Sequence, residues 1–206
     1  MKNWTIKQRI LGSFAVILIL MVIMAGIAYT RLAKIDDEAT SLRQDSTPGL
    51  YYSTMINAAW YENLLLGQQI SQVDGTDATR QSDIELLRAN AERLNHLQEE
   101  YEKTIFNARD RALFDQFKQA RMAYRQIQQD ILRMDLSSPN PDVHKIVSDQ
   151  LRPAWRTGYA LTQKMVEINK TISDDSAQRI TDAVTQAKTS MLIAVIAALA
   201  AAVVCG

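Results

Sequence analysis

An uncharged apolar segment near the N-terminus, residues 10–29 (ILGSFAVILILMVIMAGIAY), limits what this chain can fold into more than any other feature. At about 1.5 Å per residue, a helix of this length spans the roughly 30 Å hydrocarbon core of a bilayer. Residues 1–9 carry three basic and no acidic side chains, which predicts that the N-terminus stays in the cytoplasm. A cleaved signal peptide is the alternative, but its apolar part normally has only about 7–15 residues. We therefore expect residues 10–29 to form a transmembrane helix.

A second apolar segment, residues 191–206 (MLIAVIAALAAAVVCG), has no charged side chain and is about four residues shorter than a full span. We expect residues 190–206 to be a second transmembrane helix that is cut within the membrane, which makes the chain a fragment of a longer protein. Two spans with a cytoplasmic N-terminus place residues 30–189 in the periplasm, outside the bacterial inner membrane. The single cysteine, Cys205, lies in the second span, so the periplasmic domain has no disulfide and depends on its hydrophobic core.

Between the two spans, apolar residues recur at intervals of three and four, as on the buried face of an amphipathic helix. Turn signals interrupt this pattern at residues 73–76 (VDGT), at Asn107, which suits a helix N-cap, and at residues 137–142 (SSPNPD). A break within the first helix is expected at Pro48, which suits the start of a new helix. Together these signals predict an all-α fold, an antiparallel up-down four-helix bundle between two transmembrane helices. Its helices are expected at about residues 31–73, 77–106, 108–135 and 142–190.

Two stretches of the chain resemble a known receptor family. The opening TIKQRILGSF, with Ile6, Arg9, Ile10 and Phe14, and the segment DSTPGLYYSTMINAAW at residues 45–60 are similar to the sensory half of methyl-accepting chemotaxis receptors. The likeness extends over the whole chain, but its motifs are loose and none is catalytic. It implies a homodimeric inner-membrane receptor that binds a small molecule in the periplasm and acts, through an adaptor, on a cytoplasmic histidine kinase. Sensor histidine kinases carry similar four-helix sensory domains, so both classes of receptor stay open.

The stretch LRPAWRTGY at residues 151–159 places Arg152 and Arg156 four apart, a spacing at which like charges on one helix repel each other. Arg121 and Arg125 repeat this pattern on the preceding helix. Counted from the turns at the tip, both pairs lie about 20–27 Å down the bundle, level with aromatic and amide side chains of the first helix. Few acidic side chains occupy this layer. The candidate ligand-binding residues are Asn57, Trp60, Tyr61, Arg121, Tyr124, Arg125, Arg152, Arg156 and Tyr159.

Guanidinium groups bind carboxylates through two parallel charge-assisted hydrogen bonds, so this layer suits a small organic anion. A di- or tricarboxylate such as malate or citrate is the first hypothesis, and an aromatic acid or an amino acid is the alternative because of the nearby aromatic side chains. In the aspartate receptor of the resembling family, arginines of the first helix hold the ligand, whereas this chain has none between Arg43 and the tip. A structural membrane-anchored bundle, whose arginines are solvated or internally paired, is the competing interpretation.

Pro153 bears on how such a receptor would signal. It lacks the N–H that would bond to the Asp149 carbonyl, so we expect it to kink the fourth helix at the arginine layer. The expected mechanism is a small ligand-induced shift of the fourth helix against the first, which the second span carries across the membrane.

Enzymes, metal proteins and nucleic-acid-binding proteins are disfavoured. His96 and His144 are isolated at polar helical positions, and no residues have the spacing of a metal site or of a nucleophile beside its base. We therefore expect no catalytic residue, no metal site and no cofactor. No basic stripe with interleaved aromatic side chains indicates nucleic acid as a partner.

Overall fold

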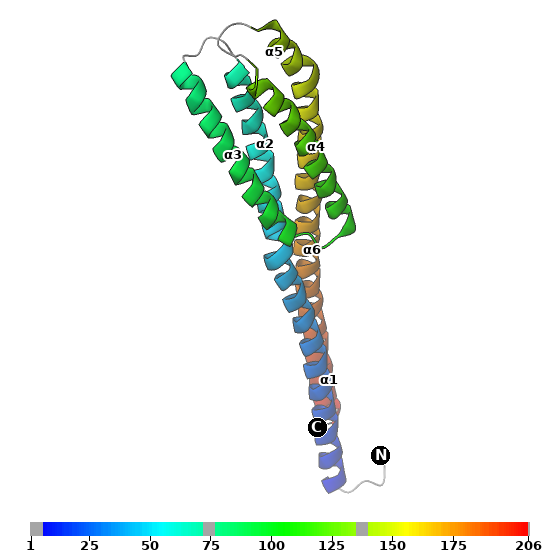
Figure 1. The fold of residues 1–206 in the computed structure, drawn as a ribbon. Helices are drawn as coiled ribbons and strands as arrows, with labels where there is room; N and C mark the ends of the chain where they lie inside the picture. Colours follow the sequence, from blue (N-terminus) through cyan, green and yellow to red (C-terminus); the bar gives the residue numbers. More distant parts are fainter. Residues whose placement is uncertain (1–5, 72–76, 135–139, 206) are drawn as a thin grey trace. The chain divides into compact units, whose positions relative to one another are not determined.

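The structure is a computed structural model that describes residues 6–71, 77–134 and 140–205. The described residues form helices and no strand, which confirms the expected all-α fold (Figure 1). The chain divides into two units, a bundle unit (residues 43–173) and a terminal unit (residues 1–42 and 174–206). In chain order the elements are α1 (Ile6–Ser41), η1 (Leu42–Ser46), α2 (Thr47–Ser71), α3 (Asp77–Lys103), α4 (Ala108–Leu132), α5 (Pro141–Ile146), η2 (Val147–Leu151) and α6 (Arg152–Cys205).

The bundle unit consists of four helices side by side, α2, α3, α4 and the continuous run from α5 through η2 into the first part of α6 (Figure 1). Apolar side chains at three- and four-residue spacing on each helix meet in a main core, as the sequence pattern predicts, and Leu66, Ile70 and Leu87 form a second, smaller cluster. This is the four-helix bundle expected from the sequence. Its largest fully buried apolar side chains are Trp60, Tyr101, Tyr124, Phe114, Phe117, Ile56, Ile70, Leu94, Leu151 and Met165.

Trp60 lies at the centre of this core and is fully buried. Its ring makes edge contacts with Phe117, at 5.4 Å between ring centroids, and with Tyr124, at 4.9 Å. Its indole N–H donates to the carbonyl of Trp155 at 3.0 Å, and the indole N–H of Trp155 donates back to the carbonyl of Trp60 at 2.9 Å. Because a buried indole N–H needs an acceptor, this reciprocal pair holds α2 and α6 in a single register.

Both prolines that follow a helical segment are preceded by a π-helical turn. Pro48 follows η1, and Pro153 follows η2, where the N–H of Arg152 donates to the carbonyl of Val147, five residues back. A π-helical turn inserts one extra residue into the helix, which accommodates a proline that lacks its own N–H. The chain stays helical through both, so the break expected at Pro48 is a π-helical turn, and a turn of the same kind lies directly before Pro153, where a kink is expected.

Helices α4 and α5 each begin with a side-chain cap. Asn107 accepts a hydrogen bond from the backbone N–H of Asp110 at 2.8 Å, which confirms it as the N-cap of α4. Asn140 does the same for the N–H of Asp142 at 3.0 Å, with Pro141 in the first turn of α5. The turn expected at residues 73–76 and the first half of the loop expected at 137–142 lie outside the described residues.

A buried polar cluster lies beside the connection between α3 and α4. The hydroxyl of Tyr101 donates to the carboxylate of Asp110 at 2.5 Å, and the amide of Asn169 donates to the Tyr101 oxygen at 2.6 Å. Asp110 is almost fully buried, and this burial raises the pKa of its carboxyl group. The cluster links α3, α4 and α6 through polar side chains.

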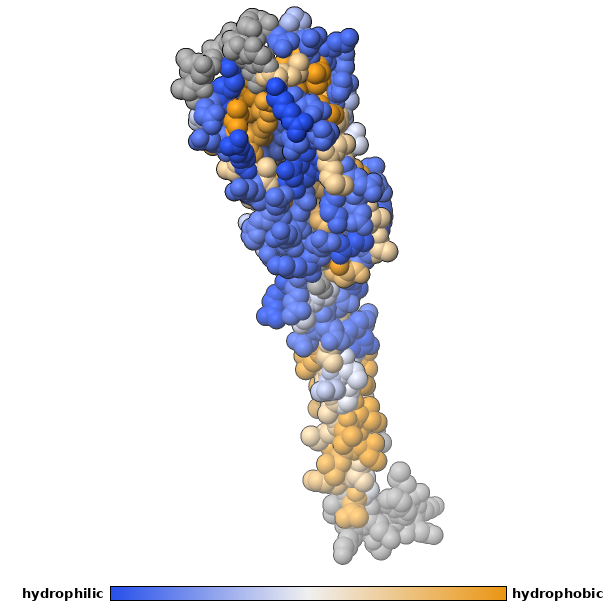
Figure 2. Space-filling view, viewed as in Figure 1, coloured by the Kyte–Doolittle hydropathy of each residue, from blue (hydrophilic) through white to orange (hydrophobic). Residues whose placement is uncertain are grey.

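The terminal unit contains the apolar parts of α1 and α6. Two helices of the described chain are long and apolar enough to cross a membrane, and almost none of the side chains in their most apolar stretches are buried. Figure 2 shows apolar side chains gathered over these parts of α1 and α6. The core helix of a water-soluble domain buries its apolar side chains, whereas a transmembrane helix presents them to lipid. Above the apolar part, Arg31 donates to the Gln186 amide oxygen at 2.7 Å, and Arg179 pairs with Glu38 at 2.8 Å.

Candidate ligand-binding site

The nine candidate residues from the sequence fall into three groups, and the first lies in the core. Trp60 and Tyr124 are both fully buried. The Tyr124 hydroxyl donates to the carbonyl of Asn63 at 3.4 Å, and burial raises the pKa of this hydroxyl. Because their polar atoms bond to backbone carbonyls, these two aromatic side chains stabilise the bundle from within. The sequence could not separate this role from ligand contact, since both need a helical face that is turned inward.

The second group lies on α2 and α6. Asn57 donates to the Thr162 hydroxyl at 2.9 Å. Tyr159 stacks on Trp155, with ring centroids 4.8 Å apart, and Tyr61 makes an edge contact with the same indole at 6.0 Å. These contacts bring three aromatic side chains together where the two helices meet.

Arg152 and Arg156 belong to this second group by position but are exposed on α6. Within the part of the chain that the structure describes, neither side chain forms an ion pair. Their repulsion at four-residue spacing is therefore screened by water and costs only about 0.2–0.5 kcal/mol. Exposure thus explains how a helix tolerates the two like charges, without a ligand.

Arg121 and Arg125 form the third group, in a groove of about 520 Å³ over α3 and α4. We call it the α3–α4 groove. Its volume falls within the range of small-molecule sites, about 300–1,000 Å³. The groove is lined by Gln98, Asp115, Lys118, Gln119, Arg121, Met122 and Arg125.

The electrostatics of the groove centre on Arg121, which is only 6% exposed. One of its terminal nitrogens donates to the carbonyl of Ala91 at 3.1 Å, and no carboxylate pairs with it among the described residues. Burial, with a smaller contribution from the neighbouring charge of Arg125, lowers the pKa of the Arg121 guanidinium to about 10. The group is thus still charged at neutral pH, although it has lost most of its hydration and has no counter-charge.

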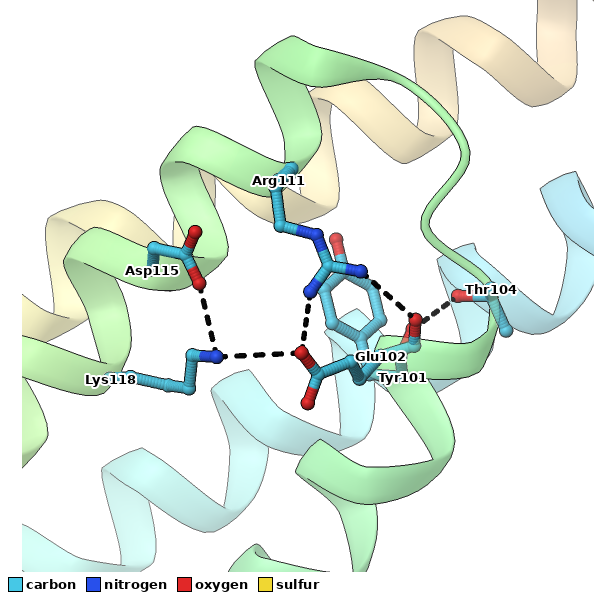
Figure 3. Close-up of polar contacts among 6 residues, drawn as sticks. All are labelled: Tyr101, Glu102, Thr104, Arg111, Asp115 and Lys118. Atoms are coloured by element: carbon cyan, nitrogen blue, oxygen red, sulfur yellow. Dashed lines mark hydrogen bonds and ion pairs between the residues drawn. The ribbon is translucent and has the colours of Figure 1, made fainter.

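Lys118, the third cation of the groove, already has acidic partners. Its ammonium group lies 3.0 Å from the Asp115 carboxylate and 3.5 Å from the Glu102 carboxylate. Arg111 completes this network by pairing with Glu102 at 2.5 Å, as Figure 3 shows. The network leaves the positive charges of Arg121 and Arg125 as the unmatched charges of the lining.

Gln98 is one of the groove residues that are absent from the nine sequence candidates. Its side-chain amide nitrogen is buried and has no hydrogen-bond partner among the described residues. A signal was present in the sequence, because Gln98 falls between Leu94 and Tyr101 on the inward-facing side of α3, where an apolar residue is expected. A polar side chain at such a position needs a partner, and the amide nitrogen of Gln98 has none within the described parts of the chain.

The comparison with protein families agrees with this architecture. The family described as a four-helix-bundle sensory module for signal transduction matches residues 3–184. The chain belongs to this family. The resemblance to the sensory half of chemoreceptors is therefore confirmed, whereas the comparison with individually curated proteins gives no match.

Membership of the family gives the chain a general role. It is a sensory module that signals to downstream partners, and modules of this family are typically not enzymes. Its two candidate membrane-spanning helices fit a membrane receptor. Among the described residues, no three His, Cys, Asp or Glu side chains are grouped so that they could hold a metal ion.

Proposed function

We propose that this chain is the sensory part of a transmembrane chemoreceptor that detects a small organic anion in the α3–α4 groove. The ligand class is a di- or tricarboxylate such as malate or citrate, with one carboxylate bound by Arg121 and Arg125. The observation that carries the proposal is the nearly buried guanidinium of Arg121, which has no counter-charge beside it. A buried charge without a partner is costly, and an arriving carboxylate would supply that partner.

The hydrogen-bonding capacity of Arg121 supports this ligand class. A guanidinium has five N–H donors, and the single bond from Arg121 to the Ala91 carbonyl leaves most of them free. Each charge-assisted bond to a carboxylate contributes about 1.5–3 kcal/mol. Arg125 adds a second positive charge, so an anion would also relieve the repulsion between the two arginines.

The proposal extends to topology and signalling. Residues 30–189 lie in the periplasm, the receptor acts as a homodimer, and the bound state is carried through the second membrane helix to a cytoplasmic adaptor and histidine kinase. The continuity of α6 from Arg152 to Cys205 supports this route, because one uninterrupted helix can transmit a small shift along its axis. Cross-linking rates between cysteines placed at the ends of the two spans should change at saturating ligand, and unchanged rates would contradict the shift.

The binding proposal is tested by thermal unfolding of the 206-residue chain in lipid nanodiscs, followed by tryptophan fluorescence. Ligand at about a hundred times its Kd stabilises the folded state by about 2.7 kcal/mol. The panel consists of malate, citrate, succinate, aromatic acids and amino acids. We expect stabilisation by organic acids, loss of that stabilisation in Arg121→Met, and its retention in Arg133→Met, which removes an exposed arginine at the end of the same helix.

Two outcomes would count against the proposal. If the stabilisation survives in Arg121→Met, the anion binds elsewhere, and the aromatic group of Tyr61, Trp155 and Tyr159 becomes the next site to test. If no compound of the panel stabilises the chain, a structural bundle or a receptor that senses through a separate binding protein is favoured.

A further inference from the structure

Gln98, on α3, has a buried polar atom without a hydrogen-bond partner among the described residues. Its side-chain nitrogen is buried and donates to no described atom of the protein, and the residue is part of the lining of the α3–α4 groove. A buried donor without an acceptor loses its hydration and gains nothing in return. Such a group is usually accounted for by strain, by water or by a function that needs it free.

The acidic groups near the groove are already engaged elsewhere. Asp115 pairs with Lys118 at 3.0 Å, and Glu102 pairs with Arg111 and Lys118, as Figure 3 shows. Neither carboxylate accepts a hydrogen bond from Gln98. The groove therefore offers two different kinds of free donor, the charged guanidinium groups of the arginines and the neutral amide of Gln98.

We propose that Gln98 determines ligand specificity, by donating from its side-chain amide to an uncharged oxygen of the anion that Arg121 binds. The inference rests on the proposed function of the groove and narrows its ligand class. The ligand is a hydroxy acid or an oxo acid, whose hydroxyl or ketone oxygen accepts from Gln98 while its carboxylate pairs with arginine. A carboxylic acid of the same length without such an oxygen leaves the amide without an acceptor, and the bound ligand also keeps water from replacing it.

The physical basis of this selectivity is the neutrality of the Gln98 donor. Carboxylates are drawn to guanidinium groups, where the bonds are charge-assisted and stronger, whereas a neutral amide matches a neutral acceptor. A site with a buried polar group discriminates against analogues that lack the matching group, because those analogues leave the group unsatisfied. For one neutral hydrogen bond to a buried donor, we expect a preference of about 10- to 100-fold in Kd.

An unsatisfied buried amide also lowers the stability of the folded chain when no ligand is bound. Replacing Gln98 with methionine keeps the length of the side chain and removes the buried donor. Gln98→Met should therefore unfold at a higher temperature than the wild type when no ligand is present. A residue retained for binding at the expense of stability shows this combination, whereas a structural amide with a partner would show the reverse.

The test measures Kd by titration calorimetry on the 206-residue chain in nanodiscs, with matched pairs of acids. The pairs are malate and succinate, 2-oxoglutarate and glutarate, and 4-hydroxybenzoate and benzoate. We expect the wild type to prefer the oxygen-bearing member of at least one pair by about 10- to 100-fold. Gln98→Met should bind both members of that pair with similar affinity and unfold at a higher temperature without ligand. Gln81→Met, which replaces an exposed glutamine on the same helix, should behave as the wild type.

The outcomes separate this inference from the proposed function. If acids bind through Arg121 but both members of every pair bind equally, the groove is an anion site and Gln98 has no role in specificity. The same conclusion follows if the preference persists in Gln98→Met, or if this variant is less stable than the wild type. If no acid of any pair binds, the proposed function fails and this inference fails with it.

Discussion

Gly158 is the position at which one added methyl group should disturb the bundle most clearly. It lies on α6 against the buried indole of Trp60. A β-carbon at this position would lie 2.5, 2.7 and 3.0 Å from the Cζ2, Cε2 and Nε1 atoms of that ring. These distances are far shorter than the roughly 3.5–4.0 Å of ordinary carbon contacts, so Gly158→Ala forces the ring or the helix to move.

The ring of Trp60 has little freedom to give way. Phe117 and Tyr124 pack against its faces and edges, and its N–H is bound to the carbonyl of Trp155. Overpacking a core costs about 1–3 kcal/mol, and the loss of the two reciprocal indole bonds costs about 1 kcal/mol each. Alanine recovers about 1 kcal/mol of helix propensity over glycine. The net loss in free energy of unfolding is therefore about 2–4 kcal/mol.

For a chain of this size, that loss lowers Tm by about 5–15 °C. Tryptophan fluorescence in nanodiscs is a suitable assay, because Trp60 and Trp155 both lie in the core and report its unfolding directly. Gly67→Ala is the matched control, since its β-carbon would first meet the Tyr124 hydroxyl at 3.3 Å. This control gains the same helix propensity with little clash, and we expect its Tm to stay within about 4 °C of the wild type.

The Tm values of the two glycine variants show whether contact with Trp60 causes the loss of stability. If Gly158→Ala is as stable as the wild type, the indole and α6 can separate without cost, and the reciprocal pair does not hold the two helices in register. If Gly67→Ala loses as much stability as Gly158→Ala, the effect belongs to any alanine on these helices and not to contact with Trp60.

Two further predictions concern pH and helix capping. Burial raises the pKa of Asp110, so the folded chain holds this proton to higher pH than the unfolded chain, and the resulting stability is lost as pH rises through the folded pKa. Asp110→Asn cannot ionise, so its Tm should rise relative to the wild type as the pH increases from about 4, the pKa of an unfolded aspartate, through the raised folded pKa, and a constant difference would contradict the assignment to Asp110. Asn107→Ala removes the cap of α4 and should cost about 1 kcal/mol, or about 2–4 °C in Tm, whereas Asn107→Asp keeps an acceptor and should cost much less. Equal losses in the two capping variants would show that the side-chain acceptor is not what stabilises the helix start.

Features that depend on neighbours in sequence could be predicted from the sequence. The apolar segment at residues 10–29, the helical spacing of the core residues and the cap at Asn107 each arise within one or two turns of one helix. The family resemblance carried by the opening residues and by residues 45–60 is also a property of the linear chain. These features fix an all-α bundle and its membership of a sensory family before any tertiary contact is known.

The candidate site could be predicted only in part, because charge pairing is decided between helices. The four arginines look alike in sequence, yet Arg121 is nearly buried without a counter-charge while Arg152 and Arg156 are exposed. The spacing of Trp60 and Tyr124 is compatible with a ligand-binding layer as well as with a core. In the structure both side chains are fully buried in the core.

The rotation of each helix about its own axis cannot be predicted from the sequence. An α-helix turns about 100° per residue, so the extra residue of a π-helical turn changes which side chains of the following helix face inward. The turn at η2 lies directly before Arg152 and Arg156. Counting residues from the tip gives their height along the bundle but not the direction in which their side chains face. The sequence by itself determined which residues are helical and which helices are amphipathic. Only the tertiary structure decided that Arg121 and Gln98 share one groove, because that depends on how α3 and α4 face each other.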